Sequence, residues 1–232
     1  MCDVHHYLGH APGVDQYFVD HERVRNFIAE IRPIIRSAPD RETMVDRLKE
    51  PFARLLADKD WLPLEFQVQC RDSGMGGGIG QYLIFRDKDA SMTLFSLVVP
   101  PGSATPIHDH LAWGLVGLYA GEQVEEVYEL PDGSSLPPGA DPGQVTLRRN
   151  KVRTLREGDF YPLLPPLDDI HLVRTISEQP SVSLHLLGND AGCVWRHKFE
   201  PQHPAHGDAG TFAVVPFRSG YTNQPCPEEQ AG

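Results

Sequence analysis

The chain has 232 residues, and its 21 Lys and Arg against 32 Asp and Glu give a net charge of −11. This acidic balance argues against nucleic acid as a partner, because nucleic-acid affinity depends on clustered basic residues. No apolar run approaches the roughly 20 residues that span a bilayer, and the start MCDVHHYLGH has no secretion-signal pattern, so we expect no membrane partner and a cytoplasmic location.

The first sixty residues are predicted to be helical and to act as packing elements. Val24, Phe27, Ile28 and Ile31 recur at helical spacing, and a second helical stretch covers residues 41–58. Asp40 is a suitable N-cap for that second helix. Pro51 is expected to end or kink it, because proline lacks a backbone N–H.

After Trp61 the sequence changes to short apolar runs separated by Gly, Pro and Asp, which predicts many short strands. The runs are LEFQVQC, YLIFR, TLFSLVV, WGLVGLYA, EQVEEVYEL, QVTLRRN, HLVRTI and SVSLHLL. Several alternate with period two, as in residues 123–128, which is typical of a strand with one face in a core. The expected fold class is mainly β, an antiparallel barrel or jelly roll with N-terminal packing helices.

We expect one domain over residues 1–232. It divides into a helical segment (1–60), a β-barrel (61–200) and a C-terminal coil (201–232), and residues 131–143 form a surface loop between strands. The four cysteines are far apart, without a CxxC pair, and are interpreted as reduced thiols.

Histidines carry the functional signal. His108 and His110 are two residues apart, so on a strand both imidazoles project from one face and can bind one metal ion. His171 opens a later apolar run and offers the third imidazole of a facial site. The structural alternative is hydrogen-bonded polar residues at a strand start. His185 follows Ser183 by two residues, and the other histidines, including His197, are interpreted as surface residues.

The spacing around these histidines resembles the first cupin motif, with glycine at the usual glutamate position. The matching residues are Gly102, His108, His110, Gly114 (the glutamate position) and Gly121. Three histidines without a carboxylate, followed by Ser-x-His, resemble the thiol dioxygenases, which include cysteine dioxygenase and 3-mercaptopropionate dioxygenase. The resemblance extends from about Leu64 to Asn223, including NDAGCVWRHKF and SGYTN, and is closest in pattern to the bacterial 3-mercaptopropionate type.

That resemblance implies a single cupin domain with Fe(II) held by His108, His110 and His171. It implies an oxidoreductase that adds both atoms of O2 to a small thiol and forms a sulfinic acid. Three neutral imidazoles leave the metal's charge uncompensated, which favours an incoming thiolate. Zinc or nickel would fit the same ligands, because affinity alone does not choose among first-row ions.

The resemblance also names substrate-binding candidates. Arg196 matches an arginine that binds the substrate carboxylate in mercaptopropionate-type relatives, and the alternative is an ordinary surface arginine beside Trp195. Cysteine dioxygenases have an arginine where this chain has Tyr82, and Arg86 is too far along to replace it. A thiol carboxylate such as 3-mercaptopropionate is therefore expected in preference to cysteine.

Two residues depart from the family pattern. Leu187 stands where the Ser-x-His-x-Tyr triad has its tyrosine, which makes the expected pocket more apolar, and Tyr161 or Tyr82 is the candidate source of the missing hydroxyl. Gly114 stands where animal cysteine dioxygenases have the cysteine that crosslinks to that tyrosine, so no thioether cofactor can form.

Ser183 and His185 are expected to act catalytically beside the metal. A hydrolase triad is disfavoured, because the sequence has no GxSxG nucleophile elbow. Competing functions are another cupin oxygenase, a metal-dependent lyase or isomerase, and a binding cupin without catalysis. The sequence leaves the thiol open, and also whether the protein is a monomer or a homo-oligomer.

Overall fold

The computed structural model describes residues 11–70, 75–202 and 208–224. Two helices precede the barrel, α1 (Glu22–Ser37) and α2 (Arg41–Ala57). The strands are β1 (Gln16–Tyr17), β2 (Gly80–Arg86), β3 (Thr93–Val99), β4 (Ile107–His108), β5 (Gly114–Ala120), β6 (Glu122–Glu129), β7 (Gln144–Arg156), β8 (Phe160–Leu163), β9 (Ile170–Thr175), β10 (Ser181–Leu187), β11 (Arg196–Pro201) and β12 (Ala209–Phe217).

Both predicted helices form. The Asp40 side chain accepts a hydrogen bond from the Thr43 backbone N–H, which confirms the N-cap. Pro51 does not end α2, which continues to Ala57. The turn after the proline is stabilised by packing, because Phe52, Leu55 and Leu56 are buried there.

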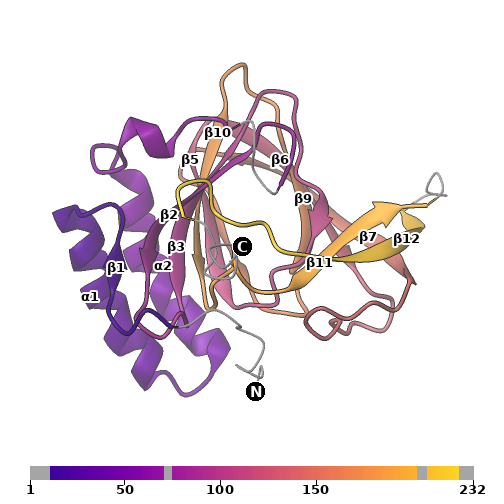
Figure 1. Cartoon of the computed structure of the whole chain (residues 1–232), viewed down its shortest axis with the longest axis horizontal. Coiled ribbons are helices and arrows are strands. Elements are labelled where there is room, and N and C mark those ends of the chain that lie inside the picture. The colour runs from indigo at the N-terminus through magenta and orange to yellow at the C-terminus, as the bar shows by residue number, and fades with distance from the viewer. Residues whose placement is uncertain (1–10, 71–74, 203–207, 225–232) are drawn as a thin grey trace, which may run out of the picture.

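The strands form two antiparallel sheets, so the mainly β prediction with two N-terminal helices is confirmed. The first sheet has the order β1-β2-β3-β10-β5-β8, and the second closes on itself in the order β11-β12-β7-β6-β9-β4. The helices cover the outer face of the first sheet (Figure 1). Within the part of the chain that the structure describes, no helix is long and apolar enough to cross a bilayer.

Two segments differ from the sequence prediction. LEFQVQC does not form a strand; Leu64–Phe66 is a 3-10 helix whose Phe66 carbonyl accepts a hydrogen bond from the Ser96 hydroxyl. The C-terminal segment is not only coil, because β12 pairs with both β11 and β7. Beyond β12, Asn223 hydrogen-bonds the backbone N–H and C=O of Leu83 and so fixes this segment to β2.

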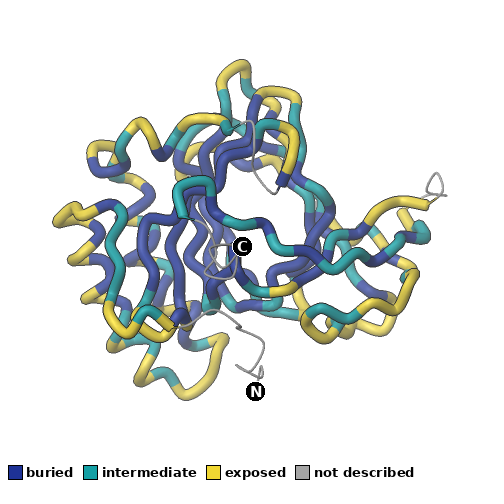
Figure 2. The backbone as a smooth tube through the Cα atoms, viewed as in Figure 1, coloured by how far each residue is buried: buried dark blue, intermediate teal, exposed yellow. Residues whose placement is uncertain are grey.

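Alternation along the strands divides the interior into separate cores. Side chains of the first sheet alternately enter the core under the helices and the core between the two sheets, and Figure 2 shows its central strands β2, β3, β10 and β5 buried along almost their whole length. A third cluster fills the closed second sheet. Cys193, in the intersheet core, is disulfide-bonded, which corrects the interpretation of all four cysteines as reduced thiols.

Candidate metal centre

The fold brings His108, His110 and His171 together. His108 on β4 pairs directly with His171 on β9, and His110 follows two residues after His108. One ligand atom from each side chain lies within 4.8 Å of the others. All three are buried, with exposed fractions of 1–3%. The structure therefore assembles the predicted facial set from two strands and the turn after one of them.

Hydrogen bonds fix the orientation of each ring. His108 Nδ1 lies 2.9 Å from the Pro106 carbonyl and His110 Nδ1 lies 3.2 Å from the Asp169 carbonyl, so each Nδ1 donates, because a carbonyl only accepts. His171 Nδ1 lies 2.6 Å from Glu125 Oε1. Each ring thus has Nε2 available for a ligand bond.

The residues fit a divalent transition metal. His171 Nε2 is buried and, within the described residues, has no hydrogen-bond partner. The pKa of His108 is well below its usual value, and the pKa of His110 is lowered to about 4. Burial is the largest cause of both shifts. Both imidazoles are therefore neutral at physiological pH, as metal ligation requires.

The first sheet places Ser183 and His185 opposite this cluster. Both lie on β10 and face the intersheet core, and the Ser183 hydroxyl is 3.0 Å from His185 Nε2. The His185 ring stacks on Phe95 at 4.7 Å, and its centroid lies 6.3 Å from that of His110. Burial lowers the pKa of His185, and its Nδ1 has no partner among the described atoms. A neutral polar pair thus lies next to the three-histidine cluster.

Arg196 is a buried cation near the same cluster. It is 2% exposed, so the alternative of a surface arginine is excluded. Its donors reach neutral acceptors, the carbonyls of Ala191 at 3.1 Å and Asp109 at 2.9 Å and the Ser219 hydroxyl at 2.7 Å. No carboxylate among the described residues forms an ion pair with it. Burial is the largest cause of the lowered pKa values of His108, His110 and His185, and the positive charge of Arg196 lowers them further.

The two tyrosines occupy different places. The Tyr82 ring packs in the core under the helices and its hydroxyl donates to the Val68 carbonyl at 2.8 Å, so it faces away from the histidines and cannot supply the expected hydroxyl. The Tyr161 hydroxyl lies 3.3 Å from His171 Nδ1. It therefore contacts the side of His171 opposite the available Nε2 rather than the open side of the cluster.

Leu187 and Gly114 lie side by side in the first sheet, and the leucine side chain occupies the space next to the glycine. They are paired neighbours on β10 and β5. A Cβ added at Gly114 would lie 2.4 Å from Leu187 Cδ2 and 2.5 Å from the Leu186 carbonyl oxygen. Leu187 thus fills the space beside the glycine and contributes a fully buried apolar wall to the intersheet core.

Sequence reasoning missed two buried acid–histidine contacts. Glu125 is fully buried against His171. His197, predicted to lie at the surface, is also fully buried, with Nδ1 2.6 Å from Asp109 Oδ2. The clue to Glu125 is its position two residues from Gln123 and Val127, which share the buried face of β6.

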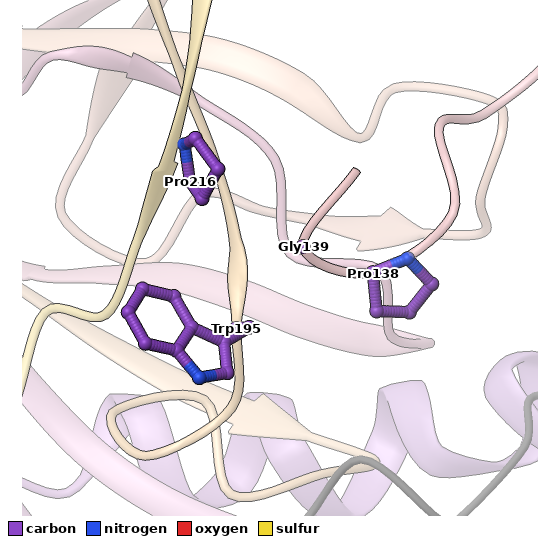
Figure 3. Close-up of a pocket in the computed structure, with 4 residues that line it drawn as sticks. All are labelled: Pro138, Gly139, Trp195 and Pro216. Atoms are coloured by element: carbon purple, nitrogen blue, oxygen red, sulfur yellow. The ribbon is translucent and has the colours of Figure 1, made fainter. Parts of the chain in front are cut away.

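The surface holds a separate hollow of about 360 Å³, lined by Pro138, Gly139, Trp195 and Pro216. Figure 3 shows the Trp195 ring and the two proline rings around it. None of the candidate site residues lines this hollow, so it is distinct from the histidine cluster.

No family model matches this chain. Among solved structures it is similar to a cupin domain of an XRE-family transcriptional regulator from Enterobacter cloacae, with 19% identity over 47% of this chain and 94% of that chain and a TM-score of 0.31. An RmlC-like cupin from Shewanella frigidimarina matches with 13% identity over 50% of this chain and 79% of that chain, at a TM-score of 0.34. An oxalate oxidase matches with 16% identity over 44% of this chain and 43% of that chain, at a TM-score of 0.33.

The chain thus spans less than half the length of the oxalate oxidase that it matches. At these scores and identities the neighbours establish no family and carry no argument about activity.

Proposed function

We propose that this protein is a non-heme Fe(II)-dependent thiol dioxygenase that converts a small thiol carboxylate, such as 3-mercaptopropionate, and O2 into the sulfinic acid. The observation that carries the proposal is that, among the residues that the structure describes, the three-imidazole cluster includes no carboxylate ligand and the buried arginine near it has no carboxylate partner. Both features call for an anionic substrate. A thiolate compensates the charge of the metal site, and a carboxylate compensates Arg196.

His108, His110 and His171 would hold the iron, which supplies redox activation of O2 and orients the thiolate sulfur when bound. Arg196 would bind the substrate carboxylate. Protein acceptors occupy three of the five N–H donors of a guanidinium, which leaves two for a carboxylate. Its bonds to Ala191, Asp109 and Ser219 fix the guanidinium before substrate arrives, which lowers the entropic cost of binding.

Ser183 and His185 would place a hydrogen-bonding pair on the opposite wall. The serine hydroxyl and the imidazole hold one another at 3.0 Å, and stacking on Phe95 fixes the ring plane. Around them the walls are apolar, including Leu187 and Val116, and exclude bulk water from the reacting sulfur. The overall reaction, RSH + O2 → RSO2H, balances without a further reductant.

An oxygen electrode tests the proposal directly. Fe(II)-loaded protein is screened against 3-mercaptopropionate, cysteine, cysteamine, mercaptosuccinate and bulkier thiols. We expect O2 consumption with a thiol carboxylate and formation of one sulfinate per O2. Iron-loaded protein that consumes no O2 with any thiol would contradict the proposal, and oxygen-independent turnover would favour a lyase or isomerase.

A further inference from the structure

The hydrogen-bond partners make the three histidines unequal. His108 and His110 donate to backbone carbonyls, whereas His171 lies 2.6 Å from a carboxylate oxygen of Glu125. The Asp169 carboxylate near His110 accepts instead from the backbone N–H groups of His110 and Leu111. Asp169 Oδ1 lies 3.5 Å from His110 Nδ1, farther than the 2.6 Å between Glu125 and His171, so His171 has the closest carboxylate partner of the three imidazoles.

Glu125 reaches this position because of strand register. On the antiparallel pair of β6 and β9, His171 is opposite Val127, and Glu125 lies two residues along on the same buried face. The Glu125 side chain is 0% exposed, so its charge is not screened by water. A buried carboxylate needs strong compensation, and here a histidine and an arginine supply it.

Arg153 binds the other oxygen of the same carboxylate. Its guanidinium lies 3.7 Å from the centre of the Tyr161 ring, and it is 22% exposed. A continuous series of polar contacts therefore leads from the surface through Arg153 and Glu125 to His171. Arg153 offsets part of the negative charge that Glu125 directs at the imidazole.

We propose that Glu125 is a positioning residue that keeps His171 in the Nδ1–H tautomer and supplies negative charge one hydrogen bond behind the metal centre, with Arg153 limiting that charge. A carboxylate partner increases the basicity of a metal-ligating imidazole. Glu125 thus supplies negative charge to the metal centre, as a carboxylate ligand would, but it does so through His171 and occupies no coordination position. This inference rests on the proposed metal centre but not on thiol oxidation.

Metal affinity and reduction potential test it without substrate. Glu125→Gln keeps an acceptor for Nδ1–H but removes the charge, and Glu126→Gln is the matched control on the opposite face of β6. By competition with a chromophoric chelator under anaerobic conditions, we expect Glu125→Gln to bind Fe(II) about 10- to 100-fold more weakly than wild type, with a more positive Fe(III)/Fe(II) potential. Glu126→Gln should match wild type in both measurements.

Arg153→Gln supplies a test of opposite sign. It removes the cation that offsets the charge of Glu125, so the Fe(III)/Fe(II) potential should become more negative. General loosening of the site would not give this result. Arg153→Gln also provides the test if Glu125→Gln does not fold. Equal Fe(II) affinity and potential in Glu125→Gln and wild type, or shifts of the same sign in Glu125→Gln and Arg153→Gln, would overturn the inference. Absence of thiol oxidation would leave these comparisons intact, so the two proposals fail separately.

Discussion

Two arginines, Arg86 and Arg196, are buried next to the segment that follows β10, and their partners differ. Arg86 is 5% exposed and its Nε lies 2.9 Å from Asp190 Oδ2, while the Tyr221 hydroxyl donates to the other oxygen of that carboxylate. Arg196 is 2% exposed, and its hydrogen-bond partners within the described residues are all neutral. A buried ion pair is closed to ligands, whereas a buried cation held by neutral acceptors retains affinity for an anion.

The difference separates a structural arginine from a binding one. Arg86 lies too far along its strand to replace the family arginine, and the structure adds a physical reason, because Asp190 already compensates its charge. Arg196 keeps its charge at a cost in desolvation, because burial lowers its pKa to about 10. Such a cost is expected where a ligand supplies the missing partner.

The largest expected effect concerns stability. Arg86→Met should lower the free energy of unfolding by about 3–5 kcal/mol, because it removes the cation that compensates the buried Asp190 carboxylate. Urea denaturation of the metal-free protein measures this, and adding Asp190→Asn should restore part of the loss. Arg196→Met should cost much less, because it strands no charge, and equal losses in the two single variants would break the comparison.

The next effect concerns substrate binding. Arg196→Met should lower kcat/KM for 3-mercaptopropionate by about 10- to 100-fold, since a charged hydrogen bond contributes roughly 1.5–3 kcal/mol, mainly through KM. Steady-state O2 uptake measures it. Cysteamine, which lacks a carboxylate, is the internal control, and a parallel loss with both thiols would remove the carboxylate contact from the mechanism.

A smaller effect tests how Arg196 is held. Ser219 accepts from Arg196 and from the Gln81 amide, so Ser219→Ala removes one neutral acceptor. We expect KM for 3-mercaptopropionate to rise by a few-fold, consistent with about 0.5–1.5 kcal/mol per hydrogen bond. Ser135→Ala, at an exposed serine in the loop before β7, is the control. An unchanged KM would show that the guanidinium is fixed without Ser219.

The smallest effect is expected at a half-exposed arginine. Arg32 bonds to Asp15, and that contact lowers the pKa of the Asp15 carboxyl below its ordinary value of 3.8. Arg32→Ala should therefore cost no more than about 1 kcal/mol at pH 7. Because the folded-state pKa is depressed, this contribution is present above pH 3.8 and disappears as the pH falls through the lower folded-state value. Urea denaturation of both forms at pH 7 and at strongly acidic pH measures it; a cost that persists in acid would contradict the assignment.

Much of the fold was predictable, because hydrophobic periodicity is a local property. The helices, the strands around the histidines and the closeness of His108 and His110 follow from spacing and from the alternation of strand faces. The place of His171 in the cluster was suggested by its position at a strand start and by the family resemblance, and it depends on the pairing of β4 with β9. The prediction that Tyr82 faces the histidines was wrong, because that orientation depends on which of the two cores, the one under the helices or the one between the sheets, each face of β2 enters. A single sequence does not report that choice when both faces are buried.

The polar environment of the site was not predictable for a related reason. In EQVEEVYEL the valines Val124 and Val127 fall on opposite faces of the strand, so the apolar residues do not choose the buried face; the structure buries Gln123 and Glu125 and leaves Val124 partly exposed. The face is chosen by pairing with β9, a contact between residues nearly fifty positions apart in the chain. Glu125 became recognisable only once that register placed it on His171.

The measurement that most directly tests the central claim is the fate of oxygen in the product. Fe(II)-loaded protein is given 3-mercaptopropionate under ¹⁸O2 in unlabelled water, and the product is analysed by mass spectrometry. The account predicts a sulfinate in which both sulfur-bound oxygens carry the label. Product without label, or turnover that continues without O2, would contradict it.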